Sequence, residues 1–149
     1  MFKRGNLLLL TILTAVTLVL VACSSTAPAE TETATEAERV KNADGYVDIN
    51  VDTLNEMLGN KDFTLVNVHI PYAGDIPDTD LSIAYNDLES HLDELPEDKD
   101  APLVIYCRSG SMSTQAAEEL VGQGYTNVME LDGGMNAWQS AGYDLVLEQ

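Results

Sequence analysis

The chain has 149 residues, which is long enough for one domain with a substantial hydrophobic core. Its 7 lysines and arginines are outnumbered by 25 aspartates and glutamates, and the formal net charge is -18 at pH 7. Such a surface repels nucleic acid and anionic lipid headgroups, which argues against a nucleic-acid partner. The histidines, His69 and His91, are isolated from the cysteines, Cys23 and Cys107, so the sequence contains no zinc-type cluster.

The first 22 residues have the features of an export signal. Lys3 and Arg4 form a positive start, and the apolar stretch 7–22 is somewhat short for a transmembrane helix, which needs about 20 residues. The stretch ends in Leu20-Val21-Ala22-Cys23, which resembles a bacterial lipobox. This resemblance implies that residues 1–22 are a lipoprotein signal peptide and that Cys23 is lipidated. An ordinary signal peptide, or an uncleaved anchor, is the alternative.

Residues 23–43 are predicted to be a flexible acidic tether. They are rich in Ser, Thr, Ala and Glu and contain few large apolar side chains, so they cannot bury enough surface to become ordered. A lipid on Cys23 would hold the protein to a membrane on the extracytoplasmic side of a bacterial cell envelope. Lipidation would also leave Cys107 as the only thiol of an exported domain, which is unusual.

Residues 44–149 are predicted to form the folded domain. Short apolar runs favour strands at 46–49, 64–68, 81–84, 103–106 and 128–131. Apolar residues at helical spacing favour helices at 51–58, 88–95, after Cys107 and around Trp138. The alternation predicts an α/β fold with a mostly parallel central sheet and helices on both faces.

Two of these helices carry end signals in the sequence. Thr53 and Glu56 suit a capping box for the first helix, and Gly59 suits its end. Pro96 is expected to close the helix that contains Leu88, Leu92 and Leu95.

The stretch 103–113 is the most informative part of the chain. Four apolar residues lead into Cys107, a short polar loop with Gly110 follows, and a helix is predicted to begin near Ser113. Cys107 would then lie at the carboxyl end of a buried strand, where loop N–H groups and a helix N-terminus favour a thiolate. An inert core cysteine is the alternative, although it would not need a Ser/Gly-rich loop followed at once by a helix.

Two motifs in this region resemble those of rhodanese-like sulfurtransferases. The first is the stretch around Cys107, and the second is Leu131-Asp132-Gly133-Gly134-Met135-Asn136-Ala137-Trp138, which is similar to the family's Asp-Gly-Gly-x-x-x-Trp ending. The resemblance covers roughly residues 44–147 and implies the rhodanese-like fold, without a cofactor. It also implies that Cys107 takes a sulfane sulfur from thiosulfate, a polysulfide or a persulfide. A thiol or cyanide would then accept this sulfur.

The residues after Cys107 are the expected substrate and anion-binding loop. Backbone N–H groups would bind the anion, hydroxyl groups would assist, and Gly110 would permit an unusual backbone conformation. The loop residues are Arg108, Ser109, Gly110, Ser111, Met112 and Ser113. The six-residue loop 107–112 is similar to that of sulfurtransferases, whereas related phosphatases and arsenate reductases have one residue more and a terminal arginine. This length argues against phosphoryl chemistry.

The sequence departs from the family pattern at three positions. Met112 stands where many relatives carry arginine, which leaves Arg108 as the only cation of the loop and makes thiosulfate a less favoured donor. Asn67 and His69 replace the usual aspartate and arginine after the second strand, and His69 is either an auxiliary proton-transfer group or a structural histidine. These changes keep a second function open: a catalytically degenerate rhodanese-like module that binds a protein or an anion.

Overall fold

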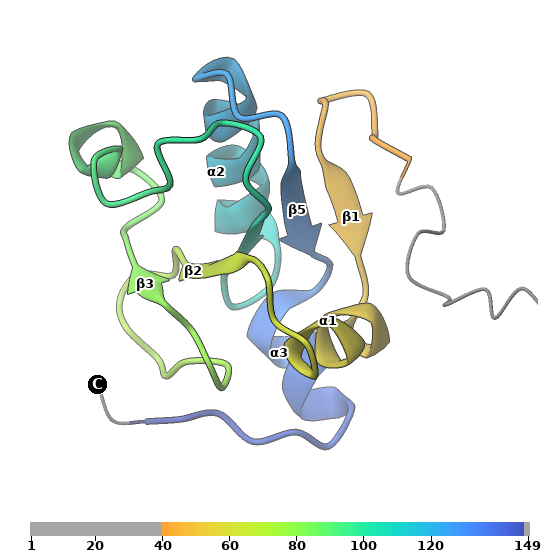
Figure 1. Cartoon of the computed structure of the whole chain (residues 1–149). Helices are drawn as coiled ribbons and strands as arrows, with labels where there is room; N and C mark the ends of the chain where they lie inside the picture. Colours follow the sequence, from red (N-terminus) through yellow and green to blue (C-terminus); the bar gives the residue numbers. More distant parts are fainter. Residues whose placement is uncertain (1–39, 148–149) are drawn as a thin grey trace, which may run out of the picture. The chain divides into compact units, whose positions relative to one another are not determined.

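The computed structural model describes residues 40–147 of the chain (Figure 1). The predicted signal peptide, Cys23 and nearly all of the predicted tether lie outside these residues. In the described part, no helix combines the length and the apolar character that crossing a bilayer requires.

The fold is a single parallel sheet whose strands follow the order β1-β5-β4-β2-β3. The strands are β1 (Val47–Ile49), β2 (Thr64–Asn67), β3 (Leu81–Ser82), β4 (Leu103–Tyr106) and β5 (Val128–Leu131). The helices are α1 (Val51–Leu58), the short 3-10 helix η1 (Leu88–His91), α2 (Ser111–Gly122) and α3 (Gly134–Ser140). The predicted α/β fold is confirmed, and β4 lies in the middle of the sheet as the sequence indicates.

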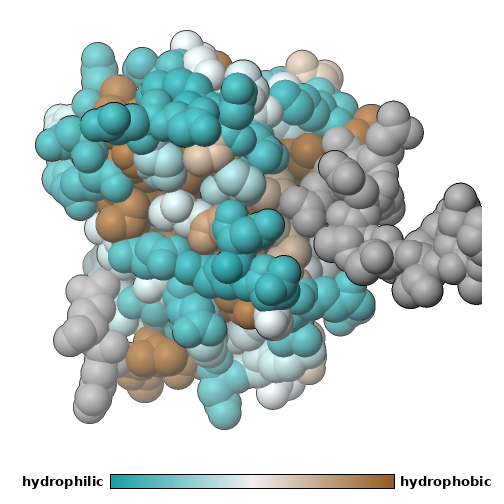
Figure 2. All heavy atoms as spheres, in the orientation of Figure 1, coloured by the Kyte–Doolittle hydropathy of each residue, from teal (hydrophilic) through white to brown (hydrophobic). Residues whose placement is uncertain are grey.

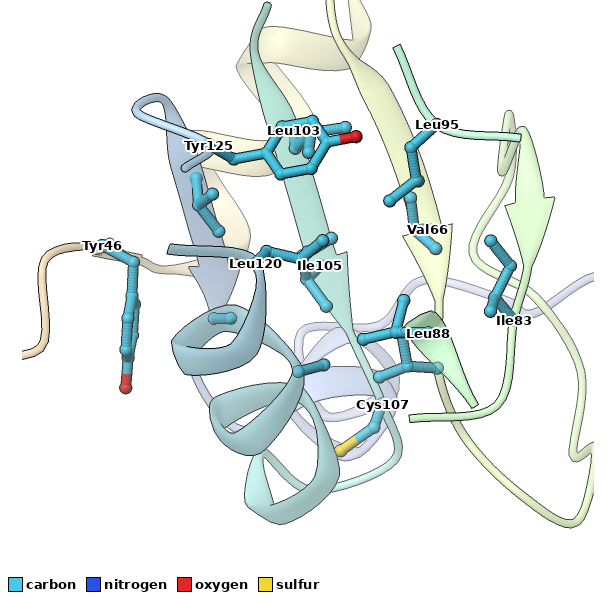
Figure 3. Packing of buried hydrophobic residues seen from close by; sticks show 14 residues of the cluster. Tyr46, Val66, Ile83, Leu88, Leu95, Leu103, Ile105, Cys107, Leu120 and Tyr125 are labelled. Carbon is cyan, nitrogen blue, oxygen red and sulfur yellow. The ribbon is translucent and has the colours of Figure 1, made fainter. Parts of the chain in front are cut away.

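Helices cover both faces of the sheet and bury two separate apolar clusters. Along β4, Leu103 and Ile105 pack beneath α2, whereas Val104 and Tyr106 pack on the opposite face, which α1 and α3 cover. Figure 3 shows the α2-side cluster, in which Cys107 is the last buried residue beyond β4. Each fully buried Leu or Ile contributes about 1.5–3 kcal/mol to stability. The end of β4 is therefore held from both faces.

Two predicted local features are wrong. The N-cap of α1 is Asn50, whose side chain accepts a hydrogen bond from Thr53 N at 2.9 Å, so Thr53 and Glu56 do not form a capping box. The reason is that α1 begins at Val51, which places Thr53 inside the first turn. The predicted helix over 88–95 is only the η1 turn, because Leu88 and Leu95 reach the α2-side cluster without a regular helix. The helix end at Gly59 is confirmed.

The surface agrees with the acidic composition. The face drawn in Figure 2 is mostly hydrophilic, and apolar residues appear on it only in small groups. The exposed large apolar residues include Ile70 and Tyr72 after β2 and Val146 near the end of the described chain.

Candidate active site

Cys107 directly follows β4, at the carboxyl edge of the parallel sheet. Its side chain is buried, with 2% exposure, and Figure 3 shows the sulfur pointing toward the first turn of α2. Gly110 N donates a hydrogen bond to Cys107 Sγ at 3.2 Å, and Ser113 Oγ donates another at 3.3 Å. The cysteine is thus both a core residue and the centre of a polar loop, two descriptions that the sequence presented as alternatives.

Helix α2 begins two residues earlier than the sequence predicts, at Ser111. Ser111, Met112 and Ser113 therefore form its first turn, and Gly110 is the N-cap. The φ angle of Gly110 is +98°, a conformation that glycine adopts readily and other residues resist. This turn brings the free N–H groups of the helix start toward Cys107.

Two opposing effects act on the ionisation of Cys107. Burial is the largest and raises the pKa of the thiol, because it disfavours the charged form. Hydrogen bonds from the Ser113 hydroxyl and from the N–H groups of Ser109, Ser113 and Met112 together outweigh burial, so the pKa lies below its ordinary value. The site favours a thiolate, which is the nucleophilic form of cysteine.

Helix α3 docks directly onto the backbone of this loop. Met135 N donates to the Cys107 carbonyl oxygen at 2.9 Å, and Asn136 N donates to the Arg108 carbonyl oxygen at 3.0 Å. A Cβ on Gly134 would lie 2.1 Å from the Cys107 carbonyl oxygen, so only glycine permits this approach. The second sequence motif therefore supports the first one, and the buried Trp138 fixes the far end of the helix by donating from Nε1 to the Asp144 carbonyl oxygen.

The side chains of the predicted loop residues point in different directions. Arg108, Ser109 and Ser111 are exposed, and Arg108 lines a surface pocket together with Ala73 and Gln139. Met112 is partly buried and packs against the α2-side cluster, which gives it a packing role. Ser113 is the one loop serine whose hydroxyl contacts the sulfur.

Asn67 has a structural role in the segment after β2. Its side-chain nitrogen donates to Asp75 Oδ1 at 2.8 Å and to the Gly74 carbonyl oxygen at 3.1 Å, and its oxygen accepts from His69 N at 2.9 Å. The Asp75 carboxylate also accepts a hydrogen bond from the Tyr106 hydroxyl, at 3.2 Å. Asn67 therefore holds the turn at residues 74–75 against the end of the sheet.

His69 lies beyond the end of β2, half-buried. Among the described residues, its Nδ1 has no hydrogen-bond partner. Burial, followed by the positive charge of Arg108, lowers the pKa of His69, so the ring is neutral at neutral pH. His69 thus lies close enough to Arg108 to respond to its charge. The role of His69 as an auxiliary group stays a prediction.

Glu130 is a candidate site residue that the sequence reasoning missed. It lies on β5 with 3% exposure, and its Oε1 accepts a hydrogen bond from Ser113 Oγ. Burial raises the pKa of Glu130 to about 7, Asp132 and Asp48 act in the same direction, and the Ser113 bond opposes them. The sequence signal was one acid inside an otherwise apolar strand. In residues 40–147, no group of three or more His, Cys, Asp or Glu side chains is arranged to hold a metal ion.

Comparisons with known proteins agree with this geometry. A family model described as the rhodanese-like domain matches residues 33–141. A sulfurtransferase from Allochromatium vinosum is 37% identical over 103 residues, which are 66% of this chain and 94% of that protein. The thiosulfate sulfurtransferase GlpE from Pseudomonas entomophila is 49% identical over 43 residues, which are 29% of this chain and 39% of that protein.

The fold has counterparts among solved structures. The crystal structure of a rhodanese-related protein from Thermoplasma volcanium has 28% sequence identity and a TM-score of 0.58, and the match covers 68% of this chain and 98% of that one. This similarity confirms the fold that the two motifs predicted. With the family model spanning most of the described residues, the chain belongs to the rhodanese-like domain family.

Proposed function

We propose that this chain is a sulfurtransferase or persulfide carrier that moves sulfane sulfur through a persulfide on Cys107. The observation that carries the proposal is the set of N–H and O–H donors around Cys107 Sγ at the carboxyl end of β4. Such donors stabilise an anionic sulfur. A thiolate is anionic, and so is a persulfide. The relatives named sulfurtransferase support the same reaction class.

The reaction would proceed in two displacements at sulfur. In the first, the Cys107 thiolate attacks the outer sulfur of the donor and a bond forms between Sγ and that sulfur. The donor's own S–S bond breaks, and its electron pair leaves on a thiolate, or on sulfite when the donor is thiosulfate. In the second, an acceptor thiolate or cyanide takes the outer sulfur, and the electron pair of the broken bond returns to Sγ.

The loop chemistry favours persulfides or polysulfides over thiosulfate as donors. Arg108 is the only cation of the loop, and its side chain is exposed. Met112 occupies the position of an arginine in many relatives and packs into the core instead. Because the loop has no second guanidinium group, it lacks one bidentate contact to a dianionic donor such as thiosulfate. Other side chains do not replace such a contact.

The proposal places this chemistry on the extracytoplasmic side of a bacterial cell envelope. The lipobox-like stretch 20–23 and the polar residues after it support cleavage before Cys23 and attachment of lipid there. The sulfur donor and acceptor would then be extracytoplasmic molecules, reached by a domain tethered to the membrane.

A binding module without catalysis is the second candidate. It is favoured by the burial of Cys107, since a residue with 2% exposure is difficult for a substrate to reach. Turnover separates the two functions. With an organic persulfide as donor and cyanide as acceptor, the sulfurtransferase should release thiocyanate continuously and faster than the uncatalysed reaction, whereas Cys107→Ser should release it no faster than a reaction without protein. A wild-type rate no greater than that of Cys107→Ser would favour the binding module.

A further inference from the structure

The Ser113 hydroxyl connects Cys107 to a buried carboxyl group. Ser113 has 0% exposure, and its Oγ lies 3.3 Å from Cys107 Sγ and within hydrogen-bond distance of Glu130 Oε1. Glu130 itself has 3% exposure. The three side chains come from α2, the end of β4 and β5, so the packing of the helix on the sheet brings them together.

This hydroxyl faces more acceptors than it has hydrogens. Ser113 Oγ lies close to Cys107 Sγ, Glu130 Oε1 and, at 3.0 Å, the Gly110 carbonyl oxygen. A serine hydroxyl carries one hydrogen. When Glu130 is ionised, its carboxylate is the strongest of these acceptors and takes that hydrogen from Cys107. When Glu130 is protonated, its own O–H donates to Ser113 Oγ, and the serine hydrogen is free for the thiolate.

The surroundings of Glu130 disfavour a second negative charge. Besides Cys107, the titratable groups that face it are Asp132 beyond the end of β5, Asp48 on β1 and Tyr46 just before β1. All three are acids, and burial is the main reason that the pKa of Tyr46 is raised, which keeps this phenol neutral. Two anions in one buried network repel each other strongly. The Cys107–Glu130 pair therefore favours a single negative charge.

We propose that Glu130 is a positioning residue for Cys107 and that the two side chains share one proton through the Ser113 hydroxyl. In the transfer, the proton of the Cys107 S–H group passes to Ser113 Oγ while the hydrogen of Ser113 passes to Glu130 Oε1. The S–H bond and the old serine O–H bond break, and a new serine O–H bond and a carboxylic acid O–H bond form. The pair keeps one negative charge throughout, which moves from the carboxylate to the sulfur.

The inference rests on the proposed function in one respect, namely that Cys107 is the reacting sulfur. It adds control of the charge on Cys107 to that function. An ionised Glu130 disfavours the Cys107 thiolate, whereas a Glu130 that holds the shared proton leaves the negative charge to the sulfur.

The test is the pH dependence of Cys107 alkylation by iodoacetamide. We would use the chain starting at residue 23 with Cys23→Ala, in which Cys107 is the only thiol. The wild-type profile should be broad, because the thiol ionises with Glu130 either neutral or charged. In Glu130→Gln the amide still donates to Ser113 but cannot ionise. Its profile should follow a single proton with an apparent pKa lower by about one unit, a roughly tenfold faster reaction at a fixed pH where wild-type Glu130 is ionised and both thiols are still largely protonated.

Two further variants separate a shared proton from a general charge effect. Glu118→Gln makes the same chemical change on the exposed face of α2 and should leave the profile unchanged. With Ser113→Ala as background, Glu130→Gln should lose most of its effect, because the connecting hydroxyl is gone. The inference is overturned by superimposable wild-type and Glu130→Gln profiles, by an equal shift in Glu118→Gln, or by an undiminished effect in the Ser113→Ala background.

A measurement on the wild type keeps the inference testable if Glu130→Gln does not fold. Infrared spectroscopy should detect a carboxylic acid C=O band that disappears as the pH rises. Alkylation of Cys107 removes the competing anion, so the band should then disappear at lower pH; an unchanged titration would refute the shared proton. Sulfur uptake is measured separately by mass. A chain that takes up no sulfur but shows the coupled titration refutes only the proposed function, and the reverse result refutes only this inference.

Discussion

Replacing Gly134 with alanine should separate helix α3 from the loop that holds Cys107. The new Cβ would lie 2.1 Å from the Cys107 carbonyl oxygen, 2.9 Å from its carbonyl carbon and 3.0 Å from the Arg108 carbonyl carbon. All three neighbours are backbone atoms, so no flexible side chain can yield. The helix must move, and its movement disrupts the bonds from Met135 N and Asn136 N to the loop.

The structure sets the size of the effect. Each of the two backbone hydrogen bonds contributes about 0.5–1.5 kcal/mol. Gly134 also has a φ angle of +52°, and a left-handed conformation costs a non-glycine residue about 1–2 kcal/mol. We therefore expect Gly134→Ala to lower the free energy of unfolding by about 2–5 kcal/mol, a large part of the stability of a small domain.

Urea denaturation followed by circular dichroism measures this change, and alkylation of Cys107 reports whether the loop has lost its geometry. Gly124→Ala is the matched control, because Gly124 also has a positive φ angle, +92°, but no atom lies within 4 Å of its would-be Cβ. The free energy of unfolding of the control should fall only by the conformational cost of about 1–2 kcal/mol, and its thiol should keep its reactivity. Equal losses in the two variants would refute the reasoning that close approach to Cys107 requires Gly134.

Three further predictions concern Glu130, Met112 and Cys23. Glu130 has an ordinary pKa of 4.5 in the unfolded chain and a pKa of about 7 in the folded chain. The folded protein therefore has its full stability below pH 4.5 with respect to this group, and it loses stability as the pH rises through 7, because ionised Glu130 is disfavoured in the fold. Glu130→Gln should remove this loss. In urea titrations, its free energy of unfolding should rise by up to about 3 kcal/mol relative to that of wild type between pH 4 and pH 8, and a difference that does not change with pH would contradict this prediction. Met112→Arg should raise thiosulfate turnover in the thiocyanate assay, and a wild type that already prefers thiosulfate to organic persulfides would show that this position does not govern donor choice. In a bacterial host, the mature chain should begin at Cys23 and fractionate with membranes, and Cys23→Ala should release it or block its processing; a fully soluble wild type cut elsewhere would rule out the anchor.

The order of strands and helices was predictable because it depends on local patterns. The apolar runs at 103–106 and 128–131 match β4 and β5 to the residue. The position of Cys107 followed from the same pattern, since a buried strand that ends in a polar loop places its next residue at the edge of the sheet. Helix starts were harder, because Asn50 and Thr53 are both competent caps and only the course of the chain selects between them.

The contacts between distant segments could not be predicted from spacing. The need for glycine at position 134 arises from a backbone atom of Cys107, which lies 27 residues earlier in the sequence. Glu130 appears in the sequence as one acid on a strand, and nothing nearby shows that α2 covers it or that Ser113 reaches it. Both features depend on how α2 and α3 pack against the sheet.

The most direct test of the account is the mass of the intact protein after exposure to sulfur donors. The chain starting at residue 23 with Cys23→Ala would be incubated with thiosulfate, a polysulfide or an organic persulfide and then analysed by mass spectrometry. We predict an adduct of one sulfur atom on Cys107, removed by cyanide or by a reductant and absent in Cys107→Ser. The adduct should form most completely with the persulfide or polysulfide. A folded protein that gains no sulfur from any donor, or a Cys107→Ser variant that still gains it, would contradict the proposed function.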